Sequence, residues 1–141
     1  MMGRAFALAR LNHGLTGVNP SVGCVILDRD GHIVGEGVTG VGGRPHAEEI
    51  ALDIAGSAAQ GGTAYVTLEP CRERSQGGKS CSLRLQEAGI ARVVCSVLDP
   101  HPVANGGILR LRDAGIDVMV GYRRRDAARL YAEFFASVPA S

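Results

Sequence analysis

Tryptophan is absent from the 141 residues of this chain, and aromatic residues make up only 4% of it. A protein that binds nucleic acid by stacking bases on aromatic side chains needs more of them. An excess of one charge is missing as well, because 15 Lys and Arg against 14 Asp and Glu leave a net charge of +1. Without a basic field to attract phosphate backbones, a nucleic acid partner is disfavoured, although a local basic patch could still bind one.

Long apolar runs are also missing. No segment approaches the roughly 18 apolar residues of a membrane-spanning helix, and Arg10 and Asn12 interrupt the first segment before it reaches the length of a signal-peptide core. We therefore expect a cytoplasmic protein that has no membrane partner. Paired cysteines are rare in that reducing compartment, so the four cysteines are predicted to be core residues or metal ligands.

The length and the order of elements predict one α/β domain over residues 1–141. The chain is close to the roughly 150 residues of a typical domain, and its 45% hydrophobic and 21% charged residues are ordinary for a folded protein. An opening hairpin followed by alternating helices and strands predicts a three-layer α/β/α sandwich with a five-stranded mixed sheet. Helices are expected at 1–13 (capped by Gly14), 45–59, 82–88, 107–114 and 125–136, and strands at 22–27, 32–38, 63–68, 92–98 and 116–120.

Three residues at the edges of these elements suit a metal site. His46 opens the second predicted helix, Cys71 follows the third strand, and Cys81 begins the third helix. Ligands collect at strand ends and helix starts in α/β proteins, and one histidine with two cysteines suits a catalytic Zn²⁺ whose fourth position stays open. Cys24 and Cys95 lie inside apolar strands and are expected to be core residues.

Glu48 is the candidate catalytic residue. Residues two apart on a helix point about 200° away from each other, so His46 and Glu48 can converge only over the N-terminal end of the helix. Glu48 would then lie beside the metal without binding it, which suits a carrier of protons. Taken singly, each residue has an ordinary explanation, as a helix cap, a dipole partner or a core thiol; the combination favours a site.

The spacing resembles that of zinc deaminases, which carry His-x-Glu followed by Pro-Cys-x-x-Cys. Here nine residues separate the two cysteines, and this wider gap is similar to the deaminase half of the bifunctional riboflavin-biosynthesis deaminase/reductase. The resemblance covers nearly the whole chain and is carried by residues 19–25, 45–48, 64–71, 87–94, 99–100, 111 and 114–118. It implies a cytidine-deaminase-like fold that associates with copies of itself. It also implies hydrolytic removal of an amino group from a pyrimidine carrying a ribosyl 5′-phosphate.

In that family the residues that match His46, Cys71 and Cys81 hold zinc, the match of Glu48 moves protons, and the match of Asn19 lies in the substrate pocket. This chain departs from the family at positions expected to bind substrate. Thr39 replaces a histidine, and His101 replaces an asparagine two residues after Asp99.

The loop between the zinc cysteines departs further, because residues 72–80 lack the family's histidine and prolines. Arg72, Arg74 and Lys79 surround two glycines there, which predicts a site for the phosphate of a substrate. A solvated loop is the alternative interpretation. The basic run at residues 123–125 is read as a solvated surface, with an RNA contact as the weaker alternative.

The expected function is zinc-dependent deamination of a small pyrimidine-type substrate, with or without a phosphate. Other hypotheses stay open: a free base, nucleoside or related heterocycle as substrate, an RNA-editing deaminase, or a zinc-stabilised binding module without activity. The chain has no room for the reductase of the bifunctional family, so we expect either a separate reductase in the pathway or another route for the product.

Overall fold

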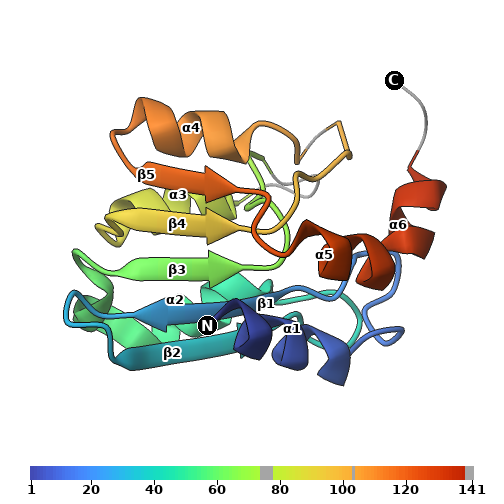
Figure 1. The fold of residues 1–141 in the computed structure, drawn as a ribbon, viewed down its shortest axis with the longest axis horizontal. Coiled ribbons are helices and arrows are strands. Elements are labelled where there is room, and N and C mark those ends of the chain that lie inside the picture. The colour runs from blue at the N-terminus through green and yellow to red at the C-terminus, as the bar shows by residue number, and fades with distance from the viewer. Residues whose placement is uncertain (74–77, 103, 139–141) are drawn as a thin grey trace.

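A five-stranded mixed sheet forms the centre of the computed structural model, which describes residues 1–73, 78–102 and 104–138. The strands are β1 (Gly23–Leu27), β2 (Ile33–Val38), β3 (Thr63–Val66), β4 (Arg92–Cys95) and β5 (Asp117–Val120). They lie in the order β2-β1-β3-β4-β5 (Figure 1). β1 pairs antiparallel with β2 and β3, whereas β3, β4 and β5 run parallel to one another.

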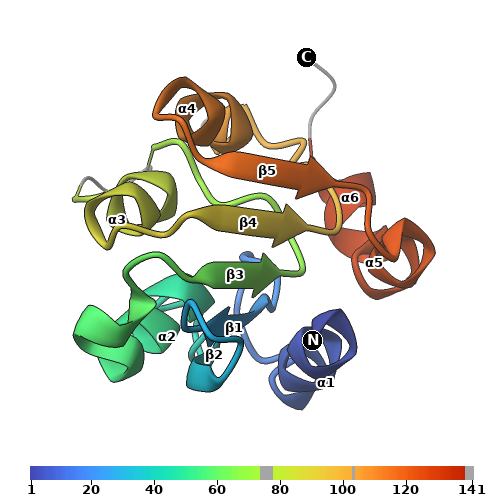
Figure 2. The ribbon, with the colours of Figure 1, turned by 60° about the vertical axis from the view of Figure 1, so that its left-hand side comes forward.

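Helices cover both faces of the sheet and make three layers (Figure 2). One face carries α2 (Ala47–Ala55), α3 (Cys81–Glu87) and α4 (Gly107–Asp113), and the other carries α1 (Met2–Leu11), α5 (Arg124–Leu130) and α6 (Ala132–Ser137). Side chains of a strand point alternately to the two faces, so Cys24 and Ile26 join the core under α2 while Val25 joins the core under α1. The predicted fold class is confirmed.

The central strands are buried on both faces, as their continuous apolar runs predict. Cys24, Val25 and Ile26 of β1 have no exposed surface, and Cys95 in β4 has none either. Cys24 and Cys95 are thus core residues, as expected. None of the helices in the described part of the chain is long and apolar enough to cross a membrane.

The helix α2 packs directly against the backbone of β2. A Cβ atom placed on Gly37 would lie 2.3 Å from the carbonyl oxygen of Ala47 and 2.9 Å from the backbone nitrogen of Ala51. Because no side chain separates the two backbones at this point, the sheet fixes the position of the first turn of α2. That turn begins directly after His46.

Two of the predicted helices are each divided in the structure. The helix expected at 45–59 is α2 followed by the 3₁₀ helix η1 (Gly56–Ala59), because Gly56 has φ +55°, outside the right-handed helical region. The helix expected at 125–136 divides into α5 and α6 at Tyr131, whose φ is −104°. The hydroxyl of Tyr131 is buried against Thr67 Oγ1 at 2.6 Å and the carbonyl oxygen of Ser21 at 2.8 Å.

The first helix ends earlier than its predicted glycine cap. It stops at Leu11, and Asn12 is its C-cap, so Gly14 lies beyond the helix end. The basic run precedes and begins α5: Arg123 pairs with Asp126 at 2.8 Å and lies 5.5 Å from the ring centroid of Phe6. This first arginine is thus held on the surface by contacts within the chain.

Candidate metal centre and active site

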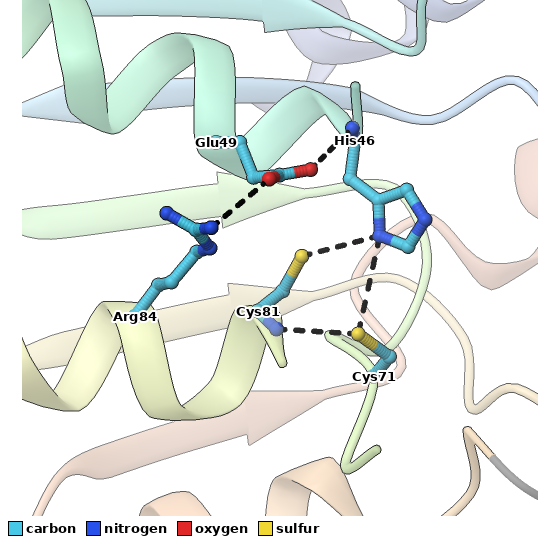
Figure 3. A network of polar contacts seen from close by, with 5 residues as sticks. All are labelled: His46, Glu49, Cys71, Cys81 and Arg84. Carbon is cyan, nitrogen blue, oxygen red and sulfur yellow. Dashed lines mark hydrogen bonds and ion pairs between the residues drawn. The ribbon is translucent and has the colours of Figure 1, made fainter. Parts of the chain in front are cut away.

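His46 stands at the N-cap of α2, where the chain is still extended at φ −72° and ψ 153°. Its backbone N–H donates to Glu49 Oε2 at 2.7 Å, and the other carboxylate oxygen of Glu49 lies 3.2 Å from Arg84 Nη2 of α3 (Figure 3). Glu49 therefore joins the start of α2 to a residue in the body of α3. These contacts hold the backbone of His46 and leave its ring to face the two cysteines.

Cys71 lies in the segment that follows β3, and Cys81 is the first residue of α3. Backbone contacts bring the two cysteines together. The backbone N–H of Cys81 donates to Cys71 Sγ at 3.2 Å, and that of Ser82 donates to the carbonyl oxygen of Cys71 at 3.1 Å. Ser80 caps the helix by accepting the backbone N–H of Leu83 at 3.2 Å. The chain thus returns after the long intercysteine loop to a point where both thiols face one another.

The three predicted ligand atoms converge. His46 Nδ1 lies 3.3 Å from Cys81 Sγ and 3.9 Å from Cys71 Sγ, and all three atoms lie within 4.8 Å of one another. Bond lengths of about 2.0–2.3 Å at tetrahedral angles place nitrogen and sulfur ligands of zinc roughly 3.6 Å apart. The donor set and its spacing fit a zinc ion bound through Nδ1 of the histidine.

The surroundings of Cys71 favour its thiolate form. Its pKa is held well below the usual range, first by the hydrogen bond to the Cys81 side chain and also by those to the His46 ring and the Cys81 backbone N–H, against the opposing effect of burial. A thiolate is the form of cysteine that binds metal. The electrostatics therefore agree with the geometry that makes Cys71 a candidate ligand.

Glu48 lies beside this cluster but outside it. The residue is only 4% exposed and lines the same cavity as His46 and Cys71. Burial raises the pKa of the Glu48 carboxyl to about 7, and the neighbouring His46 opposes that shift. A buried carboxyl that can hold or release a proton near neutral pH suits general acid–base chemistry.

The cavity above these residues has a volume of about 750 Å³, within the range of small-molecule sites. Four of the residues predicted to bind substrate line it: Asn19, Thr39, Asp99 and His101. The hydroxyl of Thr39 is already engaged, because it accepts the backbone N–H of Val22 at 2.9 Å. Burial raises the pKa of Asp99, and the hydrogen bond from the backbone N–H of His101 opposes the shift.

The predicted phosphate loop is placed differently. Lys79 Nζ lies 2.9 Å from Glu87 Oε2, and neither Lys79 nor Arg72 is among the described residues that line the cavity. Arg72 instead lines a separate hollow beside α4. Arg74 lies outside the described residues, so the anion site on this loop stays a prediction.

Several residues of the cavity were not expected from the sequence. Arg44 lines it two residues before His46, and Phe134 and Val138 reach it from the α6 segment. Glu69 holds the backbone at Asp99 and at the start of α4, because its carboxylate accepts the backbone N–H groups of Asp99, Gly106 and Ile108 at 3.0, 3.2 and 3.0 Å. The position of Arg44 two residues before the candidate ligand His46 is a signal that the sequence carries, whereas only the fold brings the C-terminal segment to the cavity.

The sequence pattern of the cytidine and deoxycytidylate deaminase zinc-binding region matches residues 1–97, a range that holds all three candidate ligands and Glu48. By class the chain is therefore a zinc-binding deaminase domain. It is 45% identical over 135 residues to the diaminohydroxyphosphoribosylamino-pyrimidine deaminase of Buchnera aphidicola subsp. Acyrthosiphon pisum, covering 95% of this chain and 90% of that protein. The chain belongs to this deaminase family of riboflavin biosynthesis.

Longer relatives show the same similarity over part of their length. The riboflavin biosynthesis protein RibD of Escherichia coli is 49% identical over 134 residues, which cover 94% of this chain and 36% of the relative. The deaminase/reductase structure from Thermotoga maritima has a TM-score of 0.91 at 36% identity over 97% of this chain and 40% of its own. This chain thus spans little more than a third of these two relatives.

Proposed function

We propose that this chain, as one deaminase domain, hydrolyses the amino group from a diaminohydroxyphosphoribosylaminopyrimidine, the substrate class in the name of its relative from Buchnera. The observation that carries the proposal is the convergence of His46 Nδ1 and two cysteine sulfurs within 4.8 Å, with Glu48 in the wall of the same cavity. A ligand set without a neighbouring carboxyl would suit a structural metal equally well.

The proposed roles follow from where the groups lie. Bound zinc would lower the pKa of a water ligand from 15.7 toward neutrality. The Glu48 carboxylate would accept one proton from the attacking water and deliver it to the ring nitrogen. It would then take the remaining proton from the hydroxyl that has added to the ring carbon and pass it to the departing amine. One C–O bond forms and one C–N bond breaks, water is consumed, and ammonia leaves. His46, Cys71 and Cys81 would hold the metal in place throughout.

A second substrate class is favoured by the contacts of two residues that were predicted to bind substrate. The hydroxyl of Thr39 is used by the backbone of Val22, and Lys79 is paired with Glu87, so two groups predicted to bind substrate are engaged elsewhere. A free base, a nucleoside or a related heterocycle would make fewer demands on these positions. Ammonia release measured across aminopyrimidines, their nucleosides and their nucleotides separates the two classes.

We also propose the cellular compartment of the enzyme, its assembly and the step that follows it. We place it in the cytoplasm, as an assembly of copies of this chain, with a reductase acting on its product. The longer relatives support that last step, because the protein from Thermotoga maritima is described as a deaminase and a reductase together.

The test compares ammonia release and bound zinc in the parent and in Glu48→Gln. The variant keeps the shape of the side chain but cannot carry the proton, so we expect parental zinc content with turnover lower by about 10²–10⁴-fold. Asp53→Asn, an exposed change on the same helix, is the matched control, and Cys81→Ser should lose both zinc and turnover. Parental turnover by Glu48→Gln would refute the role given to this residue.

A further inference from the structure

The wall of the cavity is rich in acidic groups. The acidic residues among its described lining residues are Glu48, Glu69, Glu73 and Asp99, and the only arginine or lysine among them is Arg44. An anionic group on a substrate would be repelled by these carboxylates unless a cation lay beside it. The position of the cation therefore decides where an anion can bind.

Arg44 is available for that purpose. It is exposed at the cavity and makes no hydrogen bond or ion pair with any residue in the described ranges. Two peptide units separate it from His46, so their Cα atoms lie within about 7.6 Å of each other. A substrate whose ring lies at the metal site could extend a charged group to this long side chain.

The loop that carries Arg44 is held in one shape. The N–H of Gly40 donates to the carbonyl oxygen of Pro45 at 3.0 Å, and Asn19 Nδ2 donates to the carbonyl oxygen of Gly43 at 3.2 Å. Gly43 has φ +104°, and a Cβ atom there would lie 2.7 Å from Asn19 Nδ2. The backbone under Arg44 is thus fixed against the segment that carries Asn19.

We propose that Arg44 is the residue that selects an anionic substrate, by binding its phosphate at the rim of the cavity. The inference rests on the proposed function and moves the phosphate contact from the intercysteine loop to the loop before His46. A guanidinium binds a phosphate through two parallel N–H···O bonds, which gives both affinity and orientation. Lys79 is less suited to the task, because its ammonium is paired with Glu87.

The experiment measures kcat/KM for the phosphorylated substrate and for the same compound after phosphatase treatment. In Arg44→Gln the ratio of the two values should fall about ten- to a hundredfold, the loss expected for a charged hydrogen-bonding partner. In Arg44→Lys, which keeps the positive charge but not the paired N–H donors of the guanidinium, the ratio should fall less. Arg125→Gln removes an exposed arginine that is not among the described cavity-lining residues and serves as the matched control. Zinc content and thermal midpoint are recorded for every variant.

Three results would overturn the proposal: an unchanged ratio in Arg44→Gln, an equal loss with both compounds, or a fall that follows Lys79→Gln instead. Failure of the proposed function is a separate result, in which the zinc-loaded parent deaminates neither compound. In that case, the binding of ribose 5-phosphate is compared with that of ribose in the parent and in Arg44→Gln, which tests the role of Arg44 without turnover. A preference for the phosphate that Arg44→Gln removes upholds the proposal, and binding that does not depend on Arg44 overturns it.

Discussion

The backbone contact between β2 and α2 makes Gly37→Ala a direct test of how the sheet positions the metal site. The new methyl group would lie 2.3 Å from the carbonyl oxygen of Ala47, whereas ordinary contacts of this kind begin at about 3.4 Å. The helix start must therefore move by roughly 1 Å, because both partners are backbone. The residues on either side of Ala47 are the candidate ligand His46 and the candidate acid–base Glu48.

This displacement has two measurable consequences. Overfilling a packed core costs about 1–3 kcal/mol, and each kcal/mol corresponds to about 4 °C in a chain of this size, so the thermal midpoint should fall by about 4–12 °C. Metal–ligand distances tolerate only about 0.2 Å, so zinc affinity should fall at least about tenfold. A misplacement of about 1 Å at reacting groups can cost on the order of 10² in rate, which the ammonia assay would detect.

Gly3→Ala is the matched control for adding a methyl group. Its Cβ would meet only the flexible end of Arg123, at 2.7 Å, and it lies in α1, where alanine favours the helix by up to about 1 kcal/mol over glycine. We expect the control to keep parental zinc affinity and turnover. Parental zinc affinity in Gly37→Ala, with a lowered midpoint, would show that α2 can shift without disturbing the ligands and would refute the reasoning.

Two further predictions concern stability. Zinc at 100 times its Kd should stabilise the folded chain by about 2.7 kcal/mol, which corresponds to about 10 °C in the thermal midpoint. Removing the metal with a chelator should therefore lower the midpoint by about that amount. An unchanged midpoint after verified metal removal would contradict the site. Arg4 Nη2 donates to Glu36 Oε1 at 2.8 Å, and this hydrogen bond lowers the pKa of Glu36. The pair therefore stabilises the fold above the unfolded pKa of about 4.3 and ceases to do so as the pH falls through the lower folded value. Glu36→Gln should accordingly melt up to about 4 °C below the parent at pH 7. The gap should narrow as the pH falls below the unfolded pKa, whereas a gap that stays constant on acidification would contradict the pairing.

The regular elements are predictable from the sequence because their signals are local. The apolar run at 22–27 shows β1 to be buried on both faces, and its burial is complete from Gly23 to Ile26. The division of the last helix at Tyr131 has no such signal. It falls where a tyrosine hydroxyl reaches Thr67 and Ser21, residues more than 60 positions away in the chain, and no local pattern reports that contact.

The same distinction applies to the site. His46, Cys71 and Cys81 are predictable as candidate ligands because histidine and cysteine side chains suit zinc and ligands collect at the ends of strands and the starts of helices. The structure brings their ligand atoms together. The contacts of the intercysteine loop are not predictable, because the Lys79 ammonium can pair with a carboxylate of the helix that follows as readily as with the phosphate of a substrate. Its partner Glu87 lies eight residues away at the end of α3, and the sequence carries no sign of that choice.

The candidate ligands are held by contacts that do not involve a metal. Glu49 accepts the N–H of His46 and pairs with Arg84, which fixes the start of α2 relative to α3, and Cys81 donates its own N–H to Cys71. A site assembled in this way needs little rearrangement to bind zinc, because folding has already ordered the ligand side chains. The same arrangement makes the site sensitive to the relative position of two helices. Because His46 precedes α2 and Cys81 begins α3, any change that moves α2 relative to α3 alters the ligand geometry even when every ligand remains.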